Sequence, residues 1–192
     1  GVQTCALPIC EGKWRDANVT SGGVRLEDPQ HRFRFSGRYA NSRVREALTE
    51  NGKEQQAEKS GNQLSLNLDK ISGNVQFGSI FEFGEKNYDK NDLGFIFIND
   101  YCDMNVYGSY NRFNPFWKGR FRQGNINFWV DRMGKWSLDN QLTSFAAGTY
   151  LFLIDRNNWS YFLNYSTNLE QPRDWFEPRV DGRFFLAPRI SG

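Results

Sequence analysis

The chain has 192 residues, and its 24 Lys and Arg residues nearly balance its 22 Asp and Glu residues, leaving a formal charge of +2. This balance argues against a nucleic-acid binder, which concentrates a basic excess on one face. The hydrophobic fraction of 39% is low for a packed domain, whereas 6 Trp, 8 Tyr and 17 Phe are too many for a disordered chain. The longest apolar stretch, Phe145 to Ile154, is too short for a transmembrane helix, which excludes a helical membrane protein but not a β-barrel.

The first ten residues, Gly1 to Cys10, are expected to be foreign to the protein. The letters GVQTCALPI resemble the in-frame translation of a sequencing adapter, so these residues are not expected to belong to the fold. Only Cys102 then remains, so neither a disulfide framework nor a paired-cysteine metal site is expected. Because Cys102 falls on an apolar face, we interpret it as a small packing or lipid-facing residue. Residues 11–192 are interpreted as a fragment of one domain.

Alternation of apolar and polar residues recurs along the chain and predicts β-strands. In Gln63–Asp69 the leucines at 64, 66 and 68 share one face, since side chains in a strand alternate with a period of two. In Tyr101–Tyr110 only Tyr101 and Tyr107 interrupt the polar side. The full set of expected strands covers 32–39, 63–69, 75–83, 101–110, 120–131, 136–154, 159–169 and 180–187. Residues 46–61 are charged and nearly devoid of large apolar side chains, and they are expected to form a solvated loop.

The expected connections alternate in length. Short turns are predicted at 70–74, 112–119 and 155–158, a connection of middling length at 131–135, and longer loops at 46–61, 86–98 and 170–179. Short turns at one end and long loops at the other are typical of an outer-membrane barrel. A soluble up-and-down barrel or sandwich shows the same alternation of side chains, so that alternative stays open at this point.

Three further features favour the membrane. The expected strands run about 9 to 13 residues, the length that crosses a bilayer at barrel tilt. The polar faces carry Asn, Gln, Ser, Arg and Asp, which suit a water-filled lumen better than a dry core. Aromatic residues gather near strand ends, as interfacial girdles require. They are Tyr110, Phe113, Phe116, Trp117, Trp136, Trp159 and Trp175.

Two longer motifs carry a resemblance to a known family. The first is YDxNDLGF at 88–95, and the second is FEPRxDGRxF at 176–185. With these motifs, roughly residues 24–190 resemble the outer-membrane β-barrel domain of unknown function that follows a family-nine carbohydrate-binding module in Gram-negative envelope proteins. The resemblance implies a fold and a location, the cell outer membrane of a Gram-negative bacterium, rather than a chemistry. The module itself and a barrel-ending aromatic residue have no counterpart in this sequence.

The expected fold is therefore all-β, an antiparallel meander of about eight strands that is part of a larger transmembrane β-barrel. On its own, this piece is expected to form a curved, unclosed sheet. Expected partners are outer-membrane lipid and a glycan or other small solute, with neither nucleic acid nor a cofactor.

Residues of the two motifs are the candidates for binding a ligand. Asp174, Glu177 and Asp181 resemble the paired carboxylates of a glycosidase, but interleaved arginines favour a lumenal charge ladder or a loop clamp. Asn91 and Asp92 are better explained as caps of a tight turn than as cation ligands. The candidate binding residues are Asn91, Asp92, Trp175, Glu177, Arg179, Asp181 and Arg183, with no catalytic and no metal-ligating residue expected.

Two functions of different class follow from these observations. The favoured one is an outer-membrane barrel linked to binding or passage of glycans or other solutes. The alternative is a soluble carbohydrate-binding β-sheet domain. His31 is the only histidine, which argues against histidine-based zinc sites and a Ser-His-Asp triad, and an enzyme is not expected. The two functions differ in one set of side chains, which would face outward in a barrel and inward in a soluble domain: Leu64, Leu66, Leu68, Met104, Val106, Ile126 and Leu163.

Overall fold

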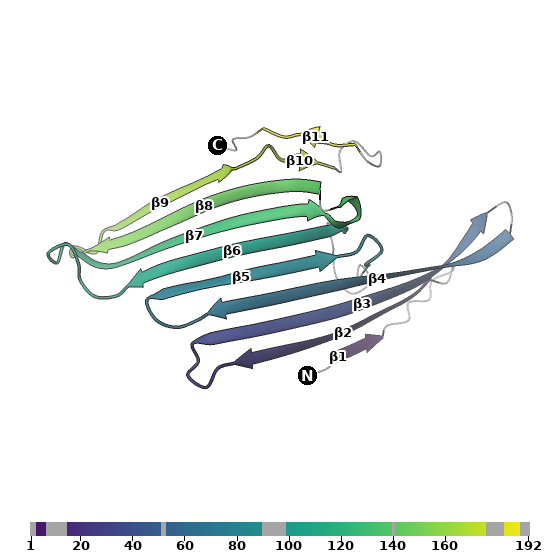
Figure 1. Ribbon diagram of the computed structural model, residues 1–192, viewed down its shortest axis with the longest axis horizontal. Helices are drawn as coiled ribbons and strands as arrows, with labels where there is room; N and C mark the ends of the chain where they lie inside the picture. Colours follow the sequence, from purple (N-terminus) through teal and green to yellow (C-terminus); the bar gives the residue numbers. More distant parts are fainter. Residues whose placement is uncertain are drawn as a thin grey trace.

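The computed structural model describes residues 3–6, 15–50, 53–89, 99–139, 141–175 and 183–188. Nine strands form one antiparallel sheet in which every strand pairs with its neighbours in chain order (Figure 1). The strands are β1 (Gln3–Ala6), β2 (Arg15–Glu27), β3 (Phe33–Glu50), β4 (Lys53–Lys70), β5 (Val75–Gly84), β6 (Tyr101–Arg112), β7 (Phe121–Lys135), β8 (Gln141–Asp155) and β9 (Ser160–Asn168). A 3-10 turn, η1 (Trp136–Leu138), follows β7, and β10 (Arg173–Asp174) pairs with β11 (Phe185–Leu186).

The prediction of an antiparallel meander of about eight strands that does not close is confirmed by β2 to β9. The ninth strand, β1, lies within Gly1 to Cys10, the segment that is expected to be foreign to the protein. The alternation of apolar residues does not predict β2, because Val19 and Val24 lie on opposite faces of that strand. The connection predicted at 131–135 is wrong, since β7 continues to Lys135 and the turn follows at 136–139.

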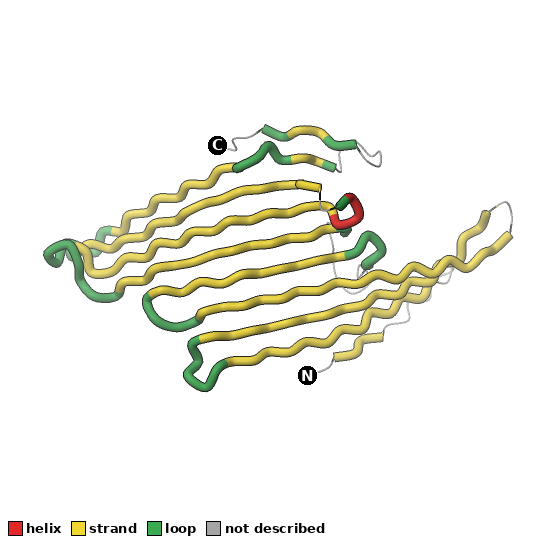
Figure 2. Tube along the Cα trace, viewed as in Figure 1, coloured by secondary structure: helices red, strands yellow, loops and turns green. Residues whose placement is uncertain are grey.

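Short turns join the strands at one end of the sheet (Figure 2). Between β2 and β3, one Asp28 carboxylate oxygen accepts the backbone amides of Arg32 at 2.5 Å and Phe33 at 2.6 Å. The Phe33 amide is the main reason that the pKa of Asp28 lies below its usual range. Between β8 and β9, an Asp155 carboxylate oxygen likewise accepts backbone amides, those of Asn157 and Trp159. Such aspartates fix tight turns by replacing backbone hydrogen bonds.

The opposite end of the sheet carries a ribbon made by β3 and β4, which runs beyond the other strands (Figure 1). The loop predicted at 46–61 is therefore wrong, because β3 and β4 remain paired as far as Glu50 and Lys53. Opposite charges meet across the ribbon, Arg45 with Glu58 at 3.3 Å and Glu46 with Lys59 at 3.8 Å. A ribbon solvated on both faces needs no apolar residues, which explains why hydrophobic alternation does not reveal it.

Two register shifts between β7 and β8 keep apolar side chains on one face. One lies between Phe121 and Gln123, and the other between Met133 and Gly134. Leu142 and Phe145 are three positions apart, so a regular strand would place them on opposite faces. The extra residue at the second shift places both on the same face, through the pairs Gly134 with Leu142 and Arg132 with Phe145.

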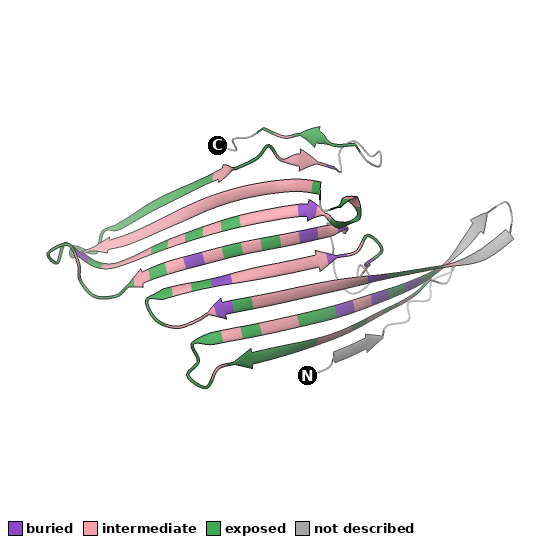
Figure 3. Ribbon diagram, in the orientation of Figure 1, coloured by how far each residue is buried: buried purple, intermediate pink, exposed green. Residues whose placement is uncertain are grey.

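Few side chains of the described sheet are buried, and most are half-buried or exposed (Figure 3). Part of the burial occurs where the segment after β5 folds onto β3 and β4. The Asp89 amide donates to the Ser42 hydroxyl at 2.8 Å, and Tyr88 is buried. Burial raises the pKa of Tyr88. No helix among the described residues is long and apolar enough to span a bilayer.

Candidate functional site

One face of the sheet carries an apolar band, in which the register also places Lys70 and Arg132. The strand register places side chains from all eight strands β2 to β9 on this face, because directly paired residues share a face. Members of the band are Val24, Leu26, Phe33, Phe35, Leu64, Leu66, Leu68, Val75, Phe77, Phe81, Phe83, Met104, Val106, Ile126, Phe128, Val130, Leu151, Leu153, Leu163 and Tyr165. Cys102 lies on the same face and is buried, which agrees with its expected packing role.

The band is open rather than covered. Of the seven residues that discriminate between the two predicted functions, five are exposed, with Met104 at 52% and Leu163 at 58%. Leu64 and Leu66 are half-buried within the same row. No second layer covers these side chains in the part of the chain that the structure describes. Contiguous apolar patches of this extent are rare on proteins surrounded by water.

Aromatic side chains border the band at the short-turn end. Phe121 is buried between the rings of Phe116, at 5.5 Å, and Tyr161, at 6.2 Å, and Trp117 lies 5.7 Å from it. The Arg112 guanidinium lies 5.2 Å from the Phe116 ring. Trp117 remains 73% exposed at the rim of this cluster. Rings with one wet and one apolar side are typical of a membrane–water boundary.

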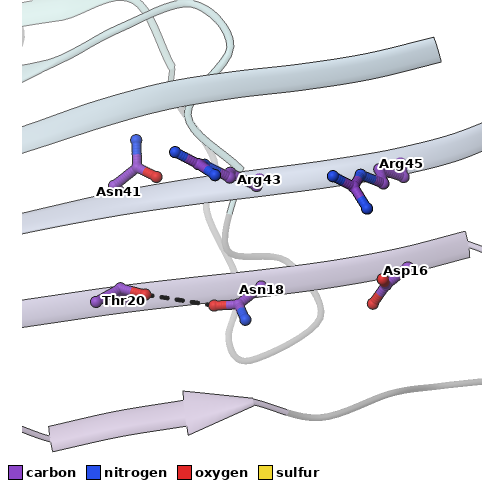
Figure 4. Close-up of a pocket in the computed structure, with 6 residues that line it drawn as sticks. All are labelled: Asp16, Asn18, Thr20, Asn41, Arg43 and Arg45. Atoms are coloured by element: carbon purple, nitrogen blue, oxygen red, sulfur yellow. Dashed lines mark hydrogen bonds between the residues drawn. The ribbon is translucent and has the colours of Figure 1, made fainter.

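The other end of the band has its own aromatic border. Phe83 and Trp136 meet edge to face at 4.6 Å, and the Tyr39 hydroxyl donates to Asn62 at 2.5 Å. Beyond Tyr39 this face of the sheet becomes polar along β2 and β3. Six side chains there surround a hollow of about 520 Å³ (Figure 4), namely Asp16, Asn18, Thr20, Asn41, Arg43 and Arg45. The apolar surface is thus limited in height on both sides.

The opposite face is mostly polar on β3 to β7 and contains a charged network there, whereas on β8 and β9 it also carries Tyr150, Phe152 and Phe162. The Arg34 guanidinium donates to Asp69 Oδ2 through Nε at 3.0 Å and through a terminal nitrogen at 2.9 Å. The Tyr107 hydroxyl donates to the other oxygen, Asp69 Oδ1. Asp69 is buried, so both of its oxygens are engaged where an unpaired charge would be costly.

Two aromatic side chains on this polar face extend over glycines of adjacent strands. Tyr107 leans over Gly78, where a Cβ atom would sit 2.7 Å from the tyrosine oxygen. Trp129 leans over Gly148, where a Cβ atom would sit 2.6–2.7 Å from three contiguous atoms of the indole. Tyr107 on β6 and Trp129 on β7 are direct cross-strand partners. Since Gly78 lies on β5 and Gly148 on β8, the two side chains lean away from each other. We refer to these two rings as the aromatic shelf.

The shelf belongs to a hollow of about 430 Å³. Polar side chains around the two rings are Arg34, Asp69, Gln76, Ser109 and Asn127. This volume falls within the range of about 300–1,000 Å³ that is usual for small-molecule sites. The polar face also holds the carboxylates of Glu82 and Asp131, which accept hydrogen bonds from Ser65 at 3.0 Å and Asn105 at 3.2 Å.

The residues predicted from the motifs are only partly visible. Trp175 is buried beside Phe184 at 4.8 Å, with the Lys135 ammonium 5.5 Å from its ring. Arg183 is exposed. The other candidates lie outside the described residues, and their roles stay predictions: Asn91, Asp92, Glu177, Arg179 and Asp181. No group of three or more His, Cys, Asp or Glu side chains among the described residues could hold a metal ion.

The aromatic shelf and the Arg34–Asp69 pair are absent from the motif-based prediction. One signal for them exists in the sequence, because Tyr107 is a large ring at a position where the alternation requires a polar side chain. Arg34 and Asp69 are 35 positions apart, and only the pairing of β3 with β4 brings them together.

Comparison with known proteins gives a family but no characterised relative. The profile of a family described as a domain of unknown function (DUF5916) matches residues 9–192. No curated protein and no solved structure matches the chain.

Proposed function

Because the chain belongs to the DUF5916 family, described only as a domain of unknown function, we propose a function from the two faces of its sheet. The protein is a segment of an outer-membrane β-barrel of a Gram-negative bacterium. Its apolar band contacts lipid, and its polar face lines a lumen that glycans or other polar solutes enter. The observation that carries this proposal is the open apolar band with an aromatic border at each end.

The height of the band fits a bilayer. On β5 the band runs from Val75 to Phe83, eight steps of about 3.3 Å, or roughly 26 Å along the strand. At the usual barrel tilt this corresponds to roughly 20 Å across the membrane, close to the apolar height of about 25 Å of outer-membrane barrels. The aromatic borders lie at the positions of the two membrane–water interfaces.

The lengths of the connections at the two ends of the sheet give an orientation in the membrane. In outer-membrane barrels short turns face the periplasm and longer connections face the outside. The turns between β2 and β3 and between β8 and β9 are then periplasmic. The ribbon of β3 and β4 then projects from the cell. A role at the envelope that involves glycans is consistent with the carbohydrate-binding module found beside the resembled barrel domain.

A spin-label experiment on the full chain tests the placement. Cys5, Cys10 and Cys102 are replaced by alanine, and a single cysteine is introduced at Met104 or at Asn105, neighbours on opposite faces of β6. The labelled proteins are reconstituted in phosphatidylcholine vesicles. We expect the label at Met104 to collide with oxygen, which dissolves in lipid, and the label at Asn105 to collide with a water-soluble nickel chelate.

Leu68→Cys and Asn67→Cys form a second matched pair on β4. Labels at Met104 and Leu68 that are shielded from both reagents, in a protein that stays out of the vesicles, would instead support the soluble carbohydrate-binding domain. In that domain a further layer would have to cover the band.

A further inference from the structure

We propose that the aromatic shelf, Tyr107 with Trp129, binds uncharged sugar rings. This inference deepens the proposed function, on which it rests, by naming the class of solute that the polar face contacts. A pyranose has a face of C–H groups that packs against the negative face of an aromatic ring, while its hydroxyl groups seek hydrogen bonds around the rim.

Tyr107 and Trp129 are both half-buried, so part of each ring remains accessible from the polar side. Gly78 and Gly148 have no side chains, which lets the hydroxyl end of Tyr107 and the indole of Trp129 lie close to the backbone of the neighbouring strand. Tyr107 is further fixed by its hydrogen bond to Asp69. The two rings therefore form a rigid surface that reaches from β5 to β8, three strand spacings or roughly 14 Å. Rigid aromatic surfaces bind with little loss of side-chain entropy.

The charged groups around the shelf are already engaged within the protein, which favours a neutral ligand. Arg34 and Asp69 neutralise one another at 2.9 Å. The Lys70 ammonium donates to the carbonyl oxygens of Ser72 at 2.6 Å and Val75 at 2.5 Å. The rest of the polar rim is formed by amides and a hydroxyl of Gln76, Ser109 and Asn127. These groups suit the hydroxyls of a sugar, whereas a phosphate or uronate would need a cation whose donors are not already held by the protein.

Binding is measured by isothermal titration calorimetry on the full chain in lauryldimethylamine oxide, a detergent without a sugar headgroup. The probes are three neutral hexasaccharides, maltohexaose, cellohexaose and chitohexaose, and hexagalacturonate as a charged probe of equal length. We expect at least one neutral probe to bind at millimolar concentration or below, and hexagalacturonate to bind more weakly.

The variants separate stacking from folding. Trp129→Ala should weaken binding roughly tenfold, and Trp129→Phe, which keeps an aromatic face, less than about threefold. Trp159→Ala removes an exposed tryptophan outside the hollow and should bind like the wild type. Each variant is first checked by its near-ultraviolet circular dichroism.

Three results would overturn the inference: no binding of any neutral probe by the wild type, hexagalacturonate binding at least as tightly, or unchanged binding by Trp129→Ala. Since the spin labels at Met104 and Asn105 report membrane placement separately, a failure of the barrel proposal registers in that experiment and not in the titration.

Discussion

The apolar band provides a direct test of lipid contact, through the depth dependence of one substitution. Val106 lies at the middle of the band on β6, and Val75 lies at its short-turn end on β5. The two valines are matched in exposure, 46% for Val106 and 51% for Val75. Val106→Arg and Val75→Arg therefore introduce the same charge from the same residue type at two depths.

The expected difference follows from the register. Val106 pairs with Ser79, which is four residues from Val75, or about 13 Å along the strand and about 10 Å across a bilayer at barrel tilt. Arginine on the lipid face costs about 2–4 kcal/mol at the midplane and about 0–1 kcal/mol near the interface. Val106→Arg should therefore lower the free energy of unfolding by about 2 kcal/mol more than Val75→Arg, roughly a thirtyfold change in the equilibrium constant.

The measurement is equilibrium unfolding in guanidinium chloride in the presence of dilauroylphosphatidylcholine vesicles, followed by tryptophan fluorescence. If water surrounded the band, both substitutions would be exposed surface changes with costs within about 0.5 kcal/mol of each other. Equal costs for the two variants would therefore refute lipid contact.

Three further predictions concern stability. Phe121→Ala should lower the free energy of unfolding by about 3–5 kcal/mol because it empties a buried aromatic site, whereas Phe113→Ala, at a 70% exposed position, should change it by less than about 0.5 kcal/mol in detergent unfolding curves. Gly61→Ala should lower the free energy of unfolding by about 1–3 kcal/mol and speed hydrogen exchange in the segment after β5, since the new Cβ would lie 2.1 Å from a backbone nitrogen of that segment. Gly22→Ala, whose Cβ would have no atom within 4 Å, is the control. Asp28→Asn should lower the unfolding midpoint at neutral pH, and the difference from the wild type should vanish in strong acid. The pKa of the Asp28 carboxyl is lowered in the folded state, so its charged form stabilises the turn at any pH above the usual pKa. This stabilisation is lost as the pH falls through the lowered pKa.

Hydrophobic alternation in the sequence predicts the strands whose apolar side chains all lie on one face. Leu64, Leu66 and Leu68 lie on one face of β4 as their alternation indicates, and the connection predicted at 155–158 is a tight turn. The ribbon at 46–61 escapes prediction because cross-strand ion pairs and backbone hydrogen bonds hold it together, and neither gives a hydrophobic pattern.

The candidate site is less predictable than the fold. Continuous motifs direct attention to one stretch of chain, as with Trp175, which is buried. The hollow around Trp129 combines single residues from several strands, and only the register of the sheet brings these residues together. A large ring on a polar face, opposite a glycine in the neighbouring strand, is a signal that sequence reasoning can use once the register is known.

Each of the two register shifts between β7 and β8 changes whether odd-numbered or even-numbered residues of one strand point to the apolar face. Before the first shift the apolar face takes Phe121, an odd-numbered residue of β7, and after it the even-numbered residues from Gly124 onward. Each segment between shifts therefore keeps its own parity, and an inserted residue disturbs the sheet only as far as the next shift. Alignments of related chains should tolerate single-residue gaps at these two points and penalise them inside the segments.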